Sequence, residues 1–445
     1  MTPRVRVVVL NYNGGELTLD CLRRLRRTEW PAGSLEIVLV DNASDDDVVA
    51  RVRQDLPDVR VVESAFNRGF AGGCNLALRD LAGVDHVALV NNDVSVEPDW
   101  LRPLVDCLEA DPSLGAACPK IRLSQPYLDV EIGVSRTFRR GRGDRRQLGV
   151  RLSGVRVDGK DCWRLAQPWR GFWGPEHGEA DEAEYQWTGA RAVLRVPVPG
   201  DREAPPTCEL RLAADFAMGV DVVSGREEER YTVGTRPGWH SVSLDGEVFE
   251  VINNVGSIVV DDGYGADRGY LERDVGQYET EADVFAWCGA AGLLRARYLA
   301  DVGLFDERLF LYYEDFELSW RGRTRGWRYR YVPASVVRHV HSATSVEGSA
   351  RSHYYNERNR LLVVTRYAPL SRVLRAVVRY LLITASYARR DLLGPFLRGA
   401  PPRGGSVRRR LRAFAGYLRL APWMLLERRA RVRSRSLPSS PIISR

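Results

Sequence analysis

The sequence has few cysteines, and no two of them are spaced to act together. Its seven cysteines are scattered over 445 residues without a C-x-x-C pair. This distribution excludes a zinc ribbon and a disulfide-stapled scaffold, because both need cysteines at short, regular spacings. A chain of this length builds cores large enough to fold without covalent staples. The cysteine content is therefore typical of a reducing, cytoplasmic compartment.

Long hydrophobic runs are also missing. The first apolar run, Val7–Leu10, is too short for the core of a signal peptide. The longest uncharged apolar stretch, Tyr380–Ala388, falls far below the ~20 residues of a spanning helix. We therefore expect neither an export signal nor a membrane-spanning helix. The 40 glycines and 23 prolines are too few for a low-complexity chain. Because 445 residues exceed the usual size of one domain, we expect two or three packed units.

The positive charge is concentrated in the last part of the sequence. Residues 1–350 contain 43 Lys and Arg against 55 Asp and Glu, whereas residues 351–445 contain 22 against 3. Over Val407–Ala430 the arginines alternate with Leu, Trp, Tyr and Phe at helical spacing, which is typical of a helix in a membrane interface. We therefore expect an anionic membrane surface as a partner of this segment, and no nucleic acid. A solvated basic tail without a partner is the alternative.

Residues 1–120 alternate short apolar runs with helical patterns, which predicts βαβ units and a doubly wound, mainly parallel sheet. Polar residues follow three of these runs. They are Asn11 and Asn13 after the first, Asp41 and Asn42 after the second, and Asn91, Asn92 and Asp93 after the fourth. Because the carboxyl ends of parallel strands meet at one edge of a sheet, we expect these side chains to share a cleft.

The pattern then changes and predicts further parts. Residues 151–260 carry short alternating runs between turns, which predicts an inserted, sandwich-like all-β unit. The α/β pattern resumes, so we expect residues 1–150 and 261–350 to form one catalytic domain. Residues 351–400 have a helical pattern, and residues 401–445 are expected to form a basic, amphipathic and partly disordered tail. Five tryptophans of the insertion could stack on sugars, although such aromatics more often fill a core: Trp163, Trp169, Trp173, Trp187 and Trp239.

Six motifs occur in an order that resembles glycosyltransferase family 2. They are VVVLNYNGG, VDNASDD, NRGFAGGCN, LVNNDVSVEPDWL, WCGAAGLLRARYLADVGLFDERLFLYYEDFELSWR and RYVPASVVRH. The resemblance covers residues 4–150 and about 262–368, leaves the β-rich insertion unmatched, and is greatest to the bacterial rhamnosyltransferase-like branch. It implies a GT-A fold and an inverting transferase that uses a nucleotide-diphosphate sugar and a divalent cation, Mg²⁺ or Mn²⁺.

The resemblance also implies roles for individual residues. Those implied for the nucleotide sugar are Asn11, Asn13, Asp41, Asn67, Arg68, Asn75, Asn92 and Asp93. Asp93 matches the last acid of the family's D-x-D metal motif, which here reads Asn-Asn-Asp, so one carboxylate is left for the cation. His339 matches a histidine that completes the metal environment, and His341 is a second candidate.

The acceptor side of the implied site centres on Asp315. This residue matches a catalytic base that takes the proton of the acceptor hydroxyl as that oxygen attacks the anomeric carbon. Glu314 is expected to orient the base or bind the acceptor, and Trp287 and Gly289 to line the acceptor site. Cys288 is expected to be a packed small side chain and not a nucleophile. The segment Gly69–Gly73 does not predict a dinucleotide site, because it lacks the G-x-G-x-x-G spacing and follows the third strand.

The sequence thus supports two hypotheses. In the leading one, the protein transfers a hexose from dTDP-rhamnose or a UDP-sugar to a glycan or polyprenyl-linked acceptor during cell-envelope polysaccharide synthesis, at the cytoplasmic face of the membrane. In the alternative, it is a non-catalytic glycan-binding or scaffold protein with a degenerate transferase site. The first requires Asp41, Asp93, Asp315 and His339 to line one cleft.

Overall fold

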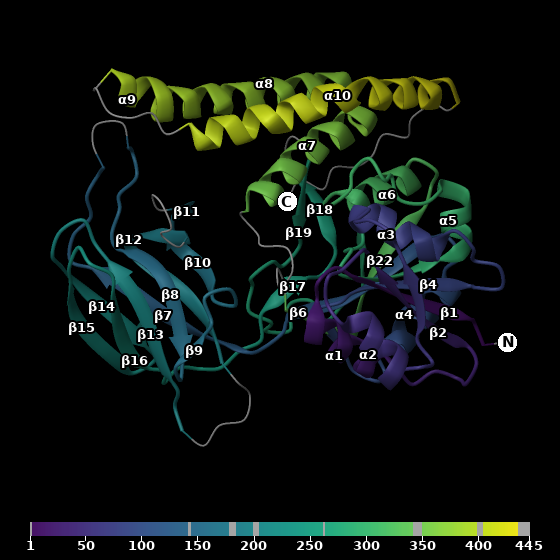
Figure 1. Cartoon of the computed structure of the whole chain (residues 1–445), viewed down its shortest axis with the longest axis horizontal. Helices are drawn as coiled ribbons and strands as arrows, with labels where there is room; N and C mark the ends of the chain where they lie inside the picture. The colour runs from purple at the N-terminus through teal and green to yellow at the C-terminus, as the bar shows by residue number, and fades with distance from the viewer. Residues whose placement is uncertain are drawn as a thin grey trace.

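The computed structural model describes residues 2–140, 144–177, 184–198, 204–260, 263–340, 349–397 and 404–434. These residues form a mixed α/β sheet covered by helices, a second sheet of antiparallel strands, and a layer of long helices, as Figure 1 shows. The expected fold class, an α/β domain with an inserted all-β unit and a C-terminal helical extension, is confirmed.

The α/β sheet has its parallel strands at one side and its mixed strands at the other. Its order is β20 (Ala282–Val284), β22 (Arg328–His339), β6 (Leu114–Leu123), β21 (Ala291–Arg295), β4 (His86–Asn91), β1 (Val5–Asn11), β2 (Leu35–Asp41) and β3 (Arg60–Glu63). From β4 to β3 all pairs are parallel, whereas β21 runs antiparallel to both β4 and β6. Two short strands extend the sheet: β5 (Val94–Val96) pairs with β22, and β17 (Ile252–Asn254) pairs with β6.

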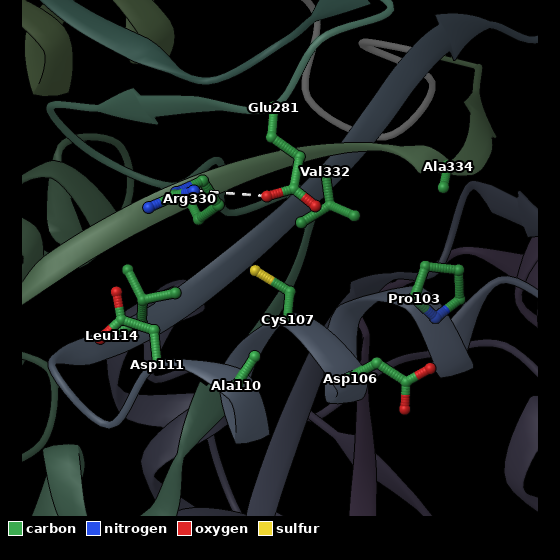
Figure 2. Close-up of a pocket in the computed structure, with 10 residues that line it drawn as sticks. All are labelled: Pro103, Asp106, Cys107, Ala110, Asp111, Leu114, Glu281, Arg330, Val332 and Ala334. Atoms are coloured by element: carbon green, nitrogen blue, oxygen red, sulfur yellow. Dashed lines mark hydrogen bonds and ion pairs between the residues drawn. The ribbon is translucent and has the colours of Figure 1, made fainter.

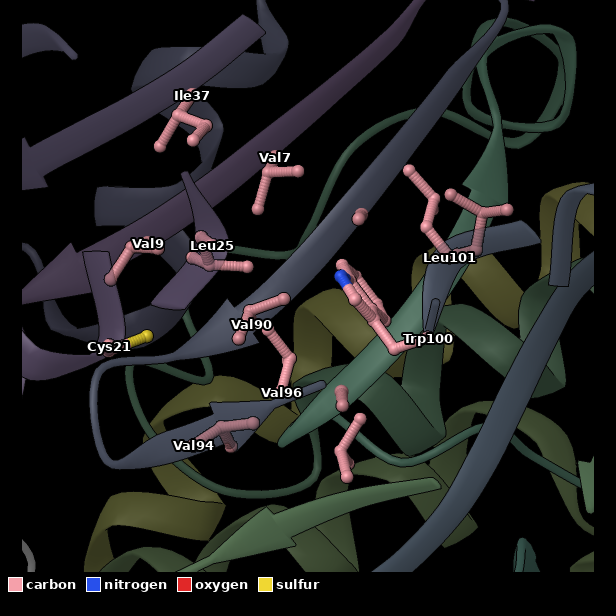
Figure 3. Close-up of a cluster of buried hydrophobic side chains, with 14 of the residues drawn as sticks. Val7, Val9, Cys21, Leu25, Ile37, Val90, Val94, Val96, Trp100 and Leu101 are labelled. Atoms are coloured by element: carbon pink, nitrogen blue, oxygen red, sulfur yellow. The ribbon is translucent and has the colours of Figure 1, made fainter. Parts of the chain in front are cut away.

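Helices cover both faces of this sheet, which explains why its central strands are apolar at nearly every position. In β1, Val7 and Val9 belong to one core cluster and Val8 to the other, as the two-residue period of a strand requires. Figure 3 shows the first cluster, in which Trp100 packs beside the strands. The helices on this face are α1 (Gly15–Leu25), α2 (Val48–Asp55) and α4 (Leu101–Ala110). Those on the other face are α3 (Gly69–Leu78), α5 (Ala296–Val302) and α6 (Glu314–Arg323).

The second sheet begins earlier than residue 151. Its order is β15 (Glu227–Val233), β14 (Met218–Ser224), β7 (Tyr127–Val134), β12 (Glu184–Pro197), β8 (Arg151–Val157), β13 (Thr207–Ala213) and β16 (Gly238–Ser243), with β9 (Lys160–Asp161), β10 (Gln167–Phe172) and β11 (Glu176–His177) beside it. Strand β7 belongs here because it pairs with β12 over seven positions and with β14 on its other side. The β strands of the insertion therefore span Tyr127 to Ser243, and a two-strand ribbon of β18 (Ser257–Val260) and β19 (Tyr264–Asp267) follows.

This second sheet curls around a single apolar core. Its two edge strands approach each other, because the Tyr231 hydroxyl of β15 donates to the Ser241 carbonyl of β16. The Tyr231 and His240 rings also lie 4.7 Å apart between centroids. Closure of this kind leaves little free strand edge. The insertion is thus a closed unit with its own core.

Four helices follow the sheets: α7 (Ala350–Tyr367), α8 (Leu370–Ala388), α9 (Gly394–Phe396) and α10 (Gly405–Ser434). In Figure 1, α8, α9 and α10 lie along one side of the molecule, and α7 lies between them and the α/β sheet. Most of the expected tail is therefore helix α10, whereas residues 401–403 and 435–445 lie outside the described residues. Among the helices that the structure describes, none combines the length and the apolarity needed to cross a membrane.

Candidate active site

The ends of β1 and β2 bring Asn11 and Asp41 together. The two residues are paired in register and both are buried. The Asn11 side-chain amide donates to Asp41 Oδ1 at 3.0 Å and to Ser44 Oγ at 2.9 Å. Asn13 has a left-handed backbone (φ 54°), and its Oδ1 accepts from the Asp45 amide at 2.7 Å. Asn11 thus fixes the Asp41 carboxylate, and Asn13 fixes the loop after it.

The loop before α3 carries Asn67 and Arg68. Asn42 holds it, since its Nδ2 donates to Asn67 Oδ1 at 3.1 Å and its Oδ1 accepts from the Arg68 amide at 2.8 Å. Sequence reasoning placed Asn42 after the second strand without assigning it a role. Asn75 is different from the expectation, because it is buried behind the loop and exchanges two hydrogen bonds with the Phe305 backbone, at 3.0 and 3.1 Å. Asn75 therefore acts as scaffold and has little surface for a ligand.

Asp93 and His339 meet where β5 pairs with the end of β22. His339 Nε2 lies 3.1 Å from Asp93 Oδ1, and His339 Nδ1 lies 2.9 Å from Asn253 Oδ1. The amide oxygen and the carboxylate oxygen are both acceptors, so each ring nitrogen of His339 faces an oxygen. Asn253 comes from β17, which enters this edge after the insertion. Sequence reasoning missed it, because a three-residue strand has no periodicity to detect.

The Asp93 and His339 pair fits a divalent cation. One carboxylate oxygen and one imidazole nitrogen converge, and Asn253 orients the imidazole from its far side, as outer partners of metal-ligating histidines do. Mg²⁺ and Mn²⁺ commonly take one or two protein ligands and complete their shell with phosphate oxygens and water. No cluster of three or more metal-ligating side chains occurs among the described residues, and His341 lies outside them. Asn92 points elsewhere, since its amide donates to Thr18 Oγ1 at 2.9 Å.

Asp315 lies in the first turn of α6 and is held from two sides. Its Oδ2 accepts from the Gly289 amide and its Oδ1 from the Phe316 amide, both at 2.7 Å. A Cβ at position 289 would lie 3.0 Å from Oδ2, so glycine leaves room for this contact. Burial raises the pKa of Asp315 to about 6, although the two amides oppose that shift. A carboxylate with a pKa near neutrality is suited to general-base catalysis.

The neighbouring Glu314 is more deeply buried. Burial, together with the charge of Asp315, raises the pKa of Glu314 to about 8. Both carboxyls of this pair therefore have raised pKa values, and burial is the main cause for each. Further along the helix, Glu317 and Arg321 form an ion pair of 2.6 Å, which supports α6.

Trp287 does not line an acceptor site. Its side chain is fully buried in the core cluster beneath the sheet, and its ring centroid lies 6.3 Å from that of Phe305. Cys288 is packed against the opposite core cluster, and burial raises its pKa well above the ordinary value, as a structural cysteine requires. Only Gly289 of the three residues contacts Asp315 directly, through its backbone.

The two halves of the site lie at the same sheet edge. The Asn91 amide donates to the Ala290 carbonyl at 2.9 Å, which joins the Asp93 loop to the Gly289 loop. On the other side, Asn254 Nδ2 donates to Asp267 Oδ1 at 2.6 Å, and the charge of Asp267 raises the pKa of Asp315 further. Strand β17 therefore contacts His339 through Asn253. Through Asn254 it contacts Asp267, whose charge acts on Asp315. Asp267 and Asn254 were also missed in the sequence.

Two cavities lie away from this edge. One of about 430 Å³ lies between α4 and the strands β6 and β22, and Figure 2 shows Cys107 and Arg330 in its wall. The other, of about 360 Å³, lies between the insertion, next to Trp169 and Arg195, and the segment 272–277. Among the five tryptophans, Trp187 is fully buried and Trp163 packs on the core, while Trp173 and Trp239 are 36% and 38% exposed. The ring of Trp169 lies 4.1 Å from the Arg195 guanidinium.

Replacing Glu314 tests the charge state of the pair. An acid with a raised native pKa stabilises the folded state below its unfolded pKa and loses that contribution as pH rises through the native value. For Glu314 the loss falls between its ordinary pKa of 4.5 and about 8. We therefore expect Glu314→Gln to remove on the order of 3–4 kcal/mol of the stability difference between about pH 5 and pH 8.

Thermal denaturation at the two pH values measures this effect. The wild type should lose more stability on going to the higher pH than the Glu314→Gln variant does. Glu247→Gln, at an 83% exposed side chain, serves as the matched control and should follow the wild type. An unchanged pH dependence in Glu314→Gln would show that the Glu314 carboxyl does not cause the loss of stability at the higher pH.

Solved structures to which this chain is similar share little sequence with it. GalNAc-T7 with UDP, GalNAc and Mn²⁺ is 13% identical over 98% of this chain and 59% of that chain, with a TM-score of 0.46. The mannosyltransferase PcManGT from Pyrobaculum calidifontis with GDP-Man and Mn²⁺ is 15% identical over 98% and 77%, with a TM-score of 0.39. S. aureus TarS 1–349 is 13% identical over 96% and 91%, with a TM-score of 0.39.

These similarities are too low to assign a ligand or an activity, and this chain spans about three fifths of the length of the first of these proteins. No curated protein matches the sequence. A family model does match: residues 6–149 fit the model of glycosyl transferase family 2. This segment contains Asn11, Asp41, Asn67, Arg68 and Asp93. The match supports a family 2 glycosyltransferase domain in residues 6–149.

Proposed function

We propose that the protein is an inverting glycosyltransferase that moves a sugar from a nucleotide diphosphate to an acceptor hydroxyl. The observation that carries this proposal is Asp315, a carboxylate of raised pKa held by the Gly289 amide at the sheet edge that also holds Asp93 and His339. Asp315 takes the hydroxyl proton while the acceptor oxygen bonds to the anomeric carbon. The bond from that carbon to the diphosphate oxygen breaks on the opposite face, and the configuration inverts.

The donor end of the proposed site recognises a pyrimidine. Asp41 is held by Asn11 with one carboxylate edge set by the Ser44 amide at 3.1 Å. Uracil and thymine both carry an N–H donor on the edge that a carboxylate would meet, so this contact suits either base. A UDP-sugar or dTDP-rhamnose is therefore the proposed donor. The resemblance to the rhamnosyltransferase-like branch favours dTDP-rhamnose.

Asp93 and His339 would hold the divalent cation. When bound, such a cation offsets the negative charge that develops on the leaving diphosphate. Arg68, at the start of α3, would add positive charge at the same group. The Arg68 side chain is held in place, since its Nε donates to Ser64 Oγ at 3.1 Å and its guanidinium lies 4.3 Å from the Phe66 ring centroid.

A donor panel tests the proposal. Purified protein is incubated with nucleotide sugars, and released nucleoside diphosphate is measured with Mn²⁺, with Mg²⁺ and with EDTA. We expect release from a pyrimidine donor and a fall of about tenfold or more when the cation is removed. Asp93→Asn should give the same fall, whereas Asp106→Asn on the surface of α4 should not. Absence of release from every donor would favour the glycan-binding or scaffold alternative.

We further propose that the helical layer lies on an anionic membrane. Thirteen of the 20 exposed large hydrophobic side chains in the described residues occur on α8, α9, α10 and their junctions. They are Leu370, Leu374, Val378, Leu381, Leu382, Leu393, Phe396, Leu397, Leu411, Leu418, Trp423, Leu425 and Leu426. We call this set the apolar face. Patches of this extent mark interaction surfaces.

The spacing and charge of the apolar face fit a lipid surface. Along α8 the exposed residues Leu374, Val378 and Leu382 recur every fourth position, so they share one side of the helix. Exposed arginines such as Arg375 and Arg379 follow them directly. A basic helix with an apolar side binds anionic headgroups while its apolar side enters the interface. The proposed acceptor is accordingly a polyprenyl-linked glycan at the cytoplasmic leaflet, in cell-envelope polysaccharide synthesis.

A further inference from the structure

The segment before the proposed catalytic base has an unusual backbone. Phe310, Tyr312 and Tyr313 all have left-handed conformations, with φ of 66°, 65° and 71°. Side chains with a Cβ disfavour this region, and such residues persist only where their surroundings enforce them. Glu314 and Asp315 follow at once as the first turn of α6. Something outside the segment must therefore hold it in this shape.

Helix α7 provides that support through Asn359. This side chain is fully buried, and its Nδ2 lies within hydrogen-bond distance of three carbonyls of the segment. The distances are 2.9 Å to Leu309, 2.9 Å to Leu311 and 2.7 Å to Tyr312. The left-handed turn directs these carbonyls inward, where no regular helix or strand supplies them with a donor. The Asn359 amide nitrogen, which carries two hydrogens, donates to them instead.

The neighbouring Arg358 adds to this support. Its Nη2 donates to the Arg308 carbonyl at 2.9 Å and to the Leu309 carbonyl at 2.8 Å. Its Nε donates to Asn359 Oδ1 at 2.8 Å, which fixes which end of the amide faces the segment. Because Asn359 Oδ1 accepts from Arg358, its Nδ2 is turned toward the carbonyls. The two side chains therefore act as one unit.

The same segment also contacts the start of α3 and the loop before it, which carries Asn67 and Arg68 and which we call the donor loop. The Ala71 amide of α3 donates to the Phe310 carbonyl at 3.3 Å, and a Cβ at Gly69 would lie only 2.2 Å from that oxygen. The Phe310 ring stacks on Tyr355 of α7, with centroids 5.1 Å apart. The segment 309–313 is thus enclosed between α7, the start of α3 and the helix that carries Asp315.

We propose that Asn359 and Arg358 are positioning residues for the Asp315 base. By holding 309–313 in its left-handed shape, they set the start of α6 relative to Gly289 and the donor loop. Neither residue touches the reacting atoms. This inference rests on the proposed transferase function, and it assigns to α7 a part in catalysis that the family 2 match over residues 6–149 does not cover.

The test compares Asn359→Ala with wild type in the transfer reaction, with turnover normalised to the fraction of protein that binds the nucleotide. Because small misplacement of a base is costly, we expect kcat to fall about 100-fold and the KM for the donor to stay within about threefold. Asn356→Ala is the matched control, since Asn356 lies on the same helix and bonds only to Ser352 among the described residues. An equal loss in kcat for both variants, or none for Asn359→Ala, would overturn the proposal.

A second substitution separates positioning from general destabilisation. Tyr312→Gly removes the Cβ that makes the left-handed turn costly. Combined with Asn359→Ala, it should recover part of the lost kcat, which a merely structural role of Asn359 would not produce. Absence of any recovery would contradict the proposed mechanism of positioning.

Hydrogen exchange keeps this inference distinct from the proposed function. Asn359→Ala should speed amide exchange over residues 308–316 by about tenfold, with other segments unchanged. If wild type released no nucleotide from any donor, the proposed function would fail while this measurement still decided whether Asn359 holds the segment. Unchanged exchange over 308–316 would overturn the inference on its own.

Discussion

Asp315→Asn is expected to lower kcat by about 10²–10⁴-fold, the range that a general base contributes. The amide keeps the shape of the side chain, and its one oxygen can still accept from the Gly289 backbone, while the bond from the Phe316 amide is lost. We expect the loss of one hydrogen bond to leave the fold intact. The amide cannot take the acceptor proton. Nucleotide binding should change little, because the proposed donor contacts lie on β1, β2 and α3. Steady-state transfer and nucleotide titration together measure the two effects.

The pH dependence of the wild type provides the second half of this test. Only ionised Asp315 can accept a proton, so kcat/KM should fall as pH drops below about 6, the pKa that burial gives this carboxyl. Asp301→Asn, at an exposed residue of α5 paired with Arg325, is the control and should retain both activity and pH profile. Transfer by Asp315→Asn at the wild-type rate would remove the assigned base and, with it, the proposed chemistry.

Disrupting the apolar face is the second change with a large expected effect. Leu374, Leu382, Leu418 and Trp423 are 65%, 65%, 54% and 57% exposed. Each loses apolar contact with lipid when replaced by serine. Since full burial of such a side chain is worth about 1.5–3 kcal/mol, partial insertion of four gives roughly 100-fold weaker binding for the quadruple variant. Sedimentation with vesicles containing phosphatidylglycerol measures it.

Substitution is a better test here than truncation. Tyr417 and Met424 of α10 are buried in the cluster that α10 forms with α7, and Glu427 pairs with Arg366. Removal of residues 403–445 would therefore expose a core. Val275→Ser, at a 77% exposed site outside the helical layer, is the matched control. Equal sedimentation of the quadruple variant and wild type would remove the membrane proposal.

The sequence predicted which residues lie together on the proposed donor side. Asn11, Asp41 and Asp93 lie at or just after the ends of short apolar runs. In a parallel sheet the carboxyl ends of the strands meet at one edge, so these residues lie together there. The resemblance added Asp315 and His339, which the structure brings to the same edge. Local periodicity therefore sufficed to place side chains whose position is set by the end of a strand.

Other residues could not be predicted because their roles depend on long-range pairing. Asn253 reaches His339 only because β17 pairs with β6 across more than 120 residues. Strand β7 alternates like any half-buried strand, so nothing local shows that it joins the second sheet. Polar residues inside motifs present a further difficulty: Asn75 and Asn92 bond to the protein itself, and a sequence pattern does not distinguish an internal partner from a ligand.

The insertion leaves the α/β sheet after β6 and returns through β17, which pairs with that same strand. The returning chain reaches the proposed site through two residues: Asn253 contacts His339, and Asn254 donates to Asp267. Evolution is then free to lengthen, shorten or replace the stretch from Tyr127 to Ser243 as a cassette, provided that the re-entry point is kept.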